Sequence, residues 1–213
     1  PILAWDYKSG PGDLFYIASG GNTPISGQMA IVVSEAHGFK VGKSGYDGTD
    51  FDISSSNEFF RVSTGGHVTK PEHPAFFATH SGGDATTSSG DLIQLGVTRH
   101  NKGSHYSTSN YYFTAPVAGV YHFTGQVWAK NGTNHARWQF SFYDATSSSW
   151  SSITQHGFHG NSVNKTDFMQ NASITYYMDV NDRMGMRAEN TDLTYYRGGG
   201  GASHTYFCGH LVG

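Results

Sequence analysis

Three segments of this 213-residue chain alternate between apolar and polar side chains along their length. Residues 121–128 begin with Tyr121 and Phe123 on one face, and residues 138–143 and 172–180 repeat the pattern. Because successive side chains of a β-strand point to opposite faces, a period of two predicts strands with one packed and one wetter face. Repeated strands of this kind, separated by turn clusters, predict an antiparallel β-sandwich or barrel.

The composition supports this fold class and argues against several functions. Charged residues make up 14% of the chain, against about 25% in an average soluble protein. Glycine accounts for 28 of 213 residues, which suits a fold with many turns. The sequence has no sustained apolar period of 3.6 residues, so we expect little helix. The net charge of −3 and the lack of a Lys/Arg run argue against a nucleic-acid partner. The sequence has no run of about 18 apolar residues, so we expect no insertion into a membrane.

The pattern changes near Pro71. Before this residue, short apolar pieces alternate with segments rich in Gly, Ser and Asp: Leu14–Ala18, Met29–Val33, Phe39–Val41, Phe51–Ile53, Phe59–Val62 and His67–Thr69. Strands this short cannot enclose a large core within one chain. They could be stable if copies from several chains packed together. A small independent β-domain or a partly ordered linker is the alternative. We therefore divide the chain into residues 1–70, a short-stranded β stem or connector, and residues 71–213, a β-sandwich head.

The segment Phe113–Phe123, which reads FTAPVAGVYHF, resembles the signature of C1q-type domains. Three further landmarks follow in the family's order: Pro74–Ala78 resembles the opening strand, Asn181–Met184 a turn in which the family usually has Gly at the first position, and Phe207–Leu211 the closing strand. In the closing strand we expect Gly209 to make room for a neighbouring side chain. The resemblance implies an all-β, ten-stranded jelly-roll β-sandwich of the C1q/TNF-like class that assembles into homotrimers.

The segment Phe60–Pro71 resembles the joint that precedes such heads in bacteriophage fibre proteins. The resemblance implies the receptor-binding tip of a tail fibre or tailspike, located on the virion. Its partners would be a host cell-surface glycan or protein receptor and other fibre proteins. The alternatives are a secreted, extracellular C1q-like trimeric ligand or lectin, and a spike that degrades polysaccharide.

Sequence motifs of enzymes are missing from this chain. There is no Gly-x-Ser-x-Gly elbow and no His-Glu-x-x-His pair, and the glycine run Gly198–Gly201 lacks the Lys-Ser/Thr of a phosphate loop. Spacing alone leaves open a pair of carboxylates for glycoside cleavage. We expect a binding module rather than an enzyme.

Metal binding has two candidate sources. The chain has 12 histidines, but no compact set with carboxylate or cysteine support is visible, so exposed turn histidines are the simpler interpretation. Some C1q-type heads hold calcium near the trimer apex, and Asp179 and Asp182 are the oxygen donors that this resemblance suggests. The alternative is that both carboxylates cap turns. We expect no other cofactor.

Three segments mix aromatic residues with Asn, His, Arg or Gly and are predicted to be receptor-binding loops: Trp128–Trp138, Ser147–Asn161 and Asp192–His204. Ring faces can stack on sugars while amides and imidazoles bond hydroxyl groups. The candidate contact residues are Trp150, His156, His159, Tyr195, Tyr196 and Arg197. The alternative is that Trp138 belongs to the core and that Tyr195 and Tyr196 lie in a subunit interface.

Overall fold

A computed structural model describes residues 3–6, 14–18, 30–32, 39–42, 45–46, 51–52, 58–63, 65–70, 72–80, 82–130, 135–159, 167–189, 193–195 and 204–212. All regular elements in these ranges are β-strands. The chain divides into two compact units, Pro1–Glu72 and His73–Gly213. In the described ranges, no helix has the length and hydropathy needed to cross a membrane.

The first unit consists of short antiparallel strands. One sheet has the order β1 (Leu3–Asp6), β2 (Leu14–Ala18) and β3 (Ala30–Val32); another has β4 (Phe39–Gly42), β7 (Glu58–Val62) and β8 (Val68–Thr69); and β5 (Gly45–Tyr46) pairs with β6 (Phe51–Asp52). Each of the six pieces predicted from the sequence overlaps one of these strands. The two strands that were not predicted, β1 and β5, contain charged residues or glycine that hide the apolar pattern.

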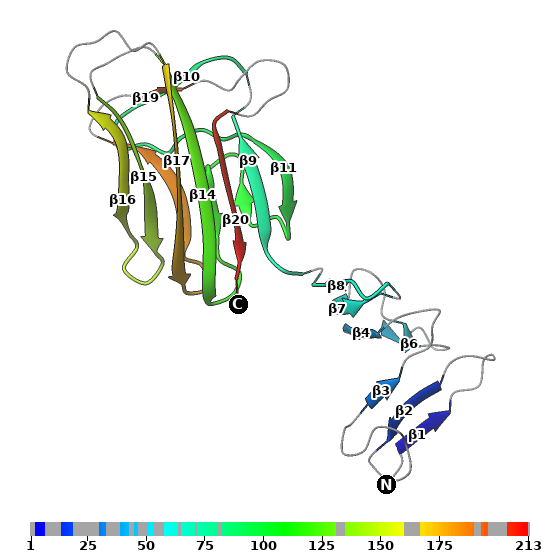
Figure 1. Cartoon of the computed structure of the whole chain (residues 1–213). Helices are drawn as coiled ribbons and strands as arrows, with labels where there is room; N and C mark the ends of the chain where they lie inside the picture. The colour runs from blue at the N-terminus through cyan, green and yellow to red at the C-terminus, as the bar shows by residue number, and fades with distance from the viewer. Residues whose placement is uncertain are drawn as a thin grey trace. The chain divides into compact units, whose positions relative to one another are not determined.

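The second unit, which we call the head, is a sandwich of two antiparallel sheets (Figure 1). Its strands are β9 (Ala75–Thr79), β10 (Ala85–Thr87), β11 (Val97–Lys102), β12 (Tyr106–Ser107), β13 (Tyr112–Thr114), β14 (Gly119–Lys130), β15 (His135–Asp144), β16 (Ser149–His159), β17 (Asp167–Met178), β18 (Arg183–Ala188), β19 (Leu193–Tyr195) and β20 (Tyr206–Leu211). The first sheet has seven strands in the order β10-β19-β14-β20-β9-β11, with β17 also paired to β14, and the second has five in the order β12-β13-β18-β15-β16. The all-β jelly-roll prediction is confirmed; the described ranges of the head contain twelve strands rather than ten, and β10, β12, β13 and β19 are segments of only two or three residues.

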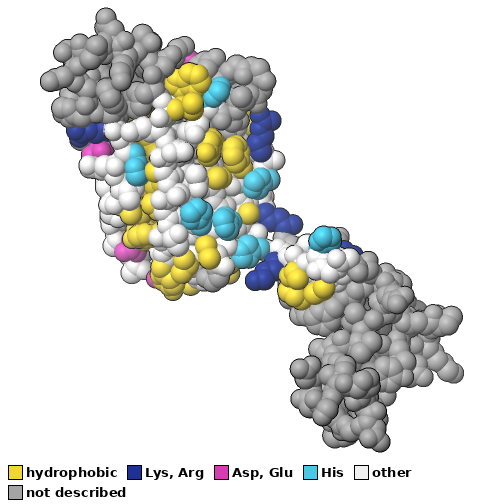
Figure 2. Space-filling view, viewed as in Figure 1, with side chains coloured by type: hydrophobic (Ala, Val, Ile, Leu, Met, Phe, Trp, Pro, Cys, Tyr) yellow, Lys and Arg dark blue, Asp and Glu magenta, His cyan; other side chains and the backbone are white. Residues whose placement is uncertain are grey.

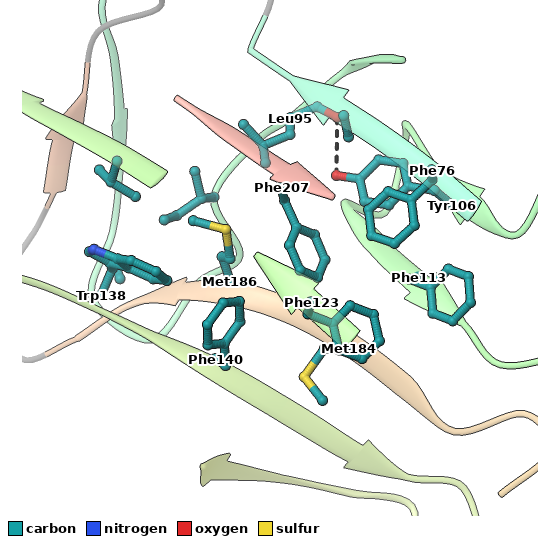
Figure 3. Packing of buried hydrophobic residues seen from close by; sticks show 14 of the residues in the cluster. Phe76, Leu95, Tyr106, Phe113, Phe123, Trp138, Phe140, Met184, Met186 and Phe207 are labelled. Carbon is teal, nitrogen blue, oxygen red and sulfur yellow. Dashed lines mark hydrogen bonds between the residues drawn. The ribbon is translucent and has the colours of Figure 1, made fainter. Parts of the chain in front are cut away.

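An aromatic core lies between the two sheets (Figure 3). As the alternation predicted, Tyr121 and Phe123 of β14 are fully buried. Phe76 stacks on Tyr106 with ring centroids 4.9 Å apart, and the Tyr106 hydroxyl donates to the Leu95 carbonyl at 3.1 Å. Burying a ring of this size stabilises the fold by about 1.5–3 kcal/mol, and the hydrogen bond removes the cost of burying the hydroxyl.

Gly209 confirms the expectation that the closing strand makes room for a neighbour. A Cβ atom at this position would overlap the Phe123 ring and crowd Phe76. Glycine therefore lets β20 lie flat against two rings of the core. The sequence pattern Phe-x-Gly-x-Leu is explained by packing rather than by chain flexibility.

Two landmarks of the family resemblance are joined by hydrogen bonds although they lie far apart in sequence. The Ala115 amide donates to the Asp182 carbonyl at 2.8 Å, and the Asn181 amide donates to the Ala115 carbonyl at 2.9 Å. Asn181 has φ of 72°, in the left-handed region that favours Gly and tolerates Asn. Asn181 is therefore a conformational substitute for the glycine that the family pattern has there.

Candidate functional site

Trp150 lies in a strand rather than in the loop that the serine-rich sequence predicted. It is the second residue of β16, at the edge of the five-stranded sheet, and lies opposite Tyr143 of β15. The Trp150 side chain is half-buried, and its ring centroid is 5.3 Å from that of Tyr143. The partners that draw the indole onto the sheet come from other strands, so the local sequence could not reveal them.

Two arginines of β18 complete a surface around Trp150. The Arg183 guanidinium lies 4.8 Å from the Tyr112 ring centroid and 4.6 Å from that of Tyr143. The Arg187 guanidinium lies 4.3 Å from the Trp150 centroid. Contacts of this geometry stabilise a partly desolvated cation by about 0.5–2 kcal/mol. We define the arginine–aromatic face as Tyr112, Gln139, Tyr143, Trp150, Arg183 and Arg187.

The alternation of β18 turns both arginines outward. Met184, Met186 and Ala188 are buried in the core, so Arg183 and Arg187 lie on the opposite side with Gly185 between them. Arg187 is opposite Gln139 of β15 and Trp150 is on the far side of that strand, so the Arg187 side chain crosses β15. Along the outward side of β15, the small Ser141 separates Gln139 from Tyr143, which leaves room for this crossing.

Several polar atoms of this face are buried without a hydrogen-bond partner. They are the Nε atoms of Arg183 and Arg187 and the Oε1 atom of Gln139, whose Nε2 donates to the Ser141 hydroxyl at 3.2 Å. Partial burial lowers the pKa of the Arg187 guanidinium, while the Asp91 carboxylate acts in the opposite direction. Unsatisfied buried donors cost free energy, and because these atoms are buried, a ligand can bind the two arginines only through their terminal N–H groups.

Tyr195 requires a correction. It was predicted to be an exposed receptor contact, but it is the last residue of β19 and its side chain is fully buried. The hydroxyl oxygen accepts hydrogen bonds from the Thr87 hydroxyl at 3.3 Å and the Gln94 amide at 3.0 Å, and burial raises its pKa. Trp138 is also buried, as the core alternative proposed.

Among the remaining candidate contacts, only His156 has a described side chain. His156 of β16 is half-buried, with its ring 4.8 Å from Trp138 and 5.9 Å from Phe140, and burial lowers its pKa. Tyr196 and Arg197 lie outside the described residues, and so does the side chain of His159.

Of the two predicted calcium donors, Asp182 caps a turn. The buried Asp182 carboxylate accepts hydrogen bonds from the Ala145 amide at 2.9 Å through Oδ1 and from the Asp179 amide at 2.8 Å through Oδ2. Asp179 accepts from the Tyr177 hydroxyl at 3.2 Å. Across the described ranges, His, Cys, Asp and Glu side chains form no group of three that could hold a metal ion. The turn-capping alternative thus accounts for Asp182, and calcium binding by Asp179 and Asp182 stays a prediction.

The family model of the C1q domain matches residues 75–212, which cover most of the head. The chain belongs to the C1q family. Among solved structures, Eiger TNF from S. frugiperda is 11% identical with a TM-score of 0.56, covering 67% of this chain and 94% of that one. The globular domain of zebrafish complement 1qA is 13% identical with a TM-score of 0.51, covering 66% and 98% respectively. No curated protein matches the sequence.

The seven-stranded sheet gives the C1q domain a second distinctive surface. We define the histidine–tyrosine face as Phe77, His122, Met169, Tyr177, Tyr206 and His210, which point away from the core on β9, β14, β17 and β20. Met169 and Tyr177 are more than half exposed. Phe77 stacks on Tyr206 at 5.2 Å, and the rings of His122 and His210 are 5.7 Å apart. Histidine and hydrophobic side chains gather on this side of the head (Figure 2).

Proposed function

We propose that this C1q domain is the receptor-binding head of a homotrimer at the tip of a bacteriophage fibre or tailspike, where it binds the host surface without enzymatic activity. The observation that carries the recognition role is the arginine–aromatic face. It places aromatic rings and two cations together on one sheet. Rigid placement of such groups is what a binding site requires, because little conformational entropy is then lost on binding.

The histidine–tyrosine face supports the assembly part of the proposal. Exposed Tyr177 and Met169 lie on the same outward side as the stacked Phe77–Tyr206 pair. Aromatic residues and methionine are enriched at protein interfaces, and obligate interfaces bury upward of about 2,000 Å². Three copies that pack these faces together would leave the arginine–aromatic faces, on the opposite sheet, accessible.

The fibre location rests on the resemblance of Phe60–Pro71 to the joint of phage fibre proteins. In this segment β7 and β8 form a hairpin that places Phe60, Arg61 and Val62 on one strand and Val68 on the other. A secreted trimeric ligand is the second candidate, and the likeness of the head to Eiger TNF and complement 1qA favours it. A polysaccharide-degrading spike is the third.

Two measurements test the proposal on the full chain. Sedimentation at low micromolar concentration should show trimer, and the fluorescently labelled chain should adhere to cells of a host within a panel of bacteria. A stable folded monomer, or adhesion to no bacterium together with binding to animal cells, would favour the ligand alternative. Release of reducing ends from host polysaccharide would instead support the spike.

A further inference from the structure

We infer that the arginine–aromatic face binds an acidic saccharide, with anionic groups on Arg183 and Arg187 and a sugar ring against Trp150. This inference rests on the proposed receptor-binding function and names the class of receptor. Arg183 and Arg187 supply two guanidinium groups. Each lies against aromatic rings, and stacking uses the flat side of a guanidinium while its N–H groups remain in the plane for bidentate contacts.

The two arginines are held in a connected arrangement. Tyr143 contacts Arg183, Trp150 contacts Arg187, and the two rings are 5.3 Å apart. An anion on one arginine therefore has a ring and a second cation next to it. A ligand longer than one sugar can use both cations, so oligosaccharides should bind more tightly than the monosaccharide.

The neighbouring carboxylates are occupied by other partners. The Glu189 Oε1 atom accepts a hydrogen bond from Gln155, and Asp144 accepts from the amides of Thr146 at 2.7 Å and Ser147 at 3.3 Å. Burial lowers the pKa of Arg187, and the Asp91 carboxylate opposes this shift electrostatically. The Nε atoms of both arginines are buried, so an anion would be bound by their terminal N–H groups.

The surroundings favour a saccharide over an acidic protein. Among the described residues of the head, the large hydrophobic side chains that are exposed belong to segments other than β13, β15, β16 and β18: Val97, Val117, Met169, Tyr177, Val180 and Val212. Protein interfaces normally have an apolar, fully buried centre. On the same side of β16 as Trp150 lies the exposed Ser152, opposite Ser141, whose hydroxyl group can donate to and accept from sugar hydroxyls.

The test is calorimetric titration of the full trimeric chain with matched saccharides. Oligogalacturonate is compared with its methyl ester, which has the same sugars without the charge, and dextran sulfate oligomers are compared with neutral dextran. The first pair reports carboxylate recognition and the second sulfate recognition. We expect one charged probe to bind, its neutral counterpart to bind at least about 10-fold more weakly, and the affinity to fall with salt.

Variants locate the site. Arg183→Gln, Arg187→Gln and Trp150→Ala should each weaken binding about 10-fold or more in a chain that remains folded. Arg187→Lys keeps the charge but loses the planar stack, so an intermediate loss is expected. Lys102→Gln removes an exposed charge from the opposite sheet and is the matched control. The arginines also stabilise the fold. If a variant melts early, Trp150→Phe, which keeps a ring but reduces its area, is titrated in its place.

Several outcomes overturn the inference. They are equal binding of charged and neutral probes, unchanged binding of all three loss variants, or a loss in Lys102→Gln as large as theirs. Host-cell adhesion separates this failure from that of the proposed function. If the chain adheres to cells and Trp150→Ala abolishes adhesion while no anionic saccharide binds, the receptor is a protein or neutral glycan, and the receptor-binding role stands. If the chain adheres to no cell yet binds oligogalacturonate, the saccharide site stands and the adhesion role fails.

Discussion

The two outward faces of the head are built on the same strand alternation but differ in what holds their side chains. On the five-stranded sheet, Arg183 and Arg187 are fixed by aromatic rings from three other strands. On the seven-stranded sheet, Met169 and Tyr177 are more than half exposed. The first face combines two guanidinium groups with partly buried rings, which suits a polar ligand. The second exposes apolar area, which suits subunit packing. Alternation thus determines that two faces exist, and the residue types decide their use.

The largest effect should come from placing a charge in the face assigned to assembly. Phe77→Asp introduces a carboxylate beside Tyr206, with which Phe77 now stacks. An uncompensated charge buried in an interface costs about 3–5 kcal/mol, so we expect sedimentation to show loss of the trimer at low micromolar concentration.

The matched control for this variant is Ser152→Asp, which places the same charge on an exposed position of β16 on the side of Trp150. It should remain trimeric. If Phe77→Asp remained trimeric while Ser152→Asp dissociated, the assignments of the two faces would be reversed.

A smaller effect is expected where the two sheets meet. Gly209→Ala forces a methyl group into the Phe123 ring, and overpacking of this kind costs about 1–3 kcal/mol. The melting temperature should fall, and saccharide binding and assembly should weaken together because both faces depend on the same core. Gly83→Ala is the control, since a Cβ there meets nothing within 4 Å. An unchanged melting temperature for Gly209→Ala would show that the Phe123 ring can move aside.

The head could be predicted from its sequence where the pattern is local. The segment Phe113–Phe123 and the closing strand have their own signatures, and both lie where the resemblance places them. The arginine–aromatic face was missed because its contacts join residues from four strands. The sequence did contain a signal. Arg183 and Arg187 are an even number of positions apart, which places both on the face of the strand opposite the buried Met184 and Met186.

Two further misplacements have different physical causes. The segment around Trp150 reads as a loop because an edge strand with one exposed face is polar along much of its length. Tyr195 reads as a loop residue because the glycine run that follows dominates the local composition, whereas its burial depends on Thr87 and Gln94, about a hundred positions earlier. In both cases the deciding partners are remote in sequence.

The smallest effect we predict is a difference in acid sensitivity between the two sheets. Burial lowers the pKa of His210 on the histidine–tyrosine face, with further lowering by His122 and His73. Burial also lowers the pKa of His156, which contacts Trp138 from β16. A histidine whose folded pKa lies below its unfolded value of about 6.5 binds fewer protons when folded. Its contribution to stability is therefore present above pH 6.5 or so and is lost as the pH falls further.

The two histidines should respond to acid in different assays. If the histidine–tyrosine face is a subunit interface, further burial and the facing His122 and His73 should make assembly acid-sensitive. His210→Gln should then reduce the dissociation measured by sedimentation between about pH 7.5 and 5.5. His156→Gln should leave that dissociation unchanged but reduce the acid-induced fall in melting temperature, because His156 packs on the core of its own chain. Equal effects of both variants in both assays would show that acid acts on the fold of each subunit rather than on one face.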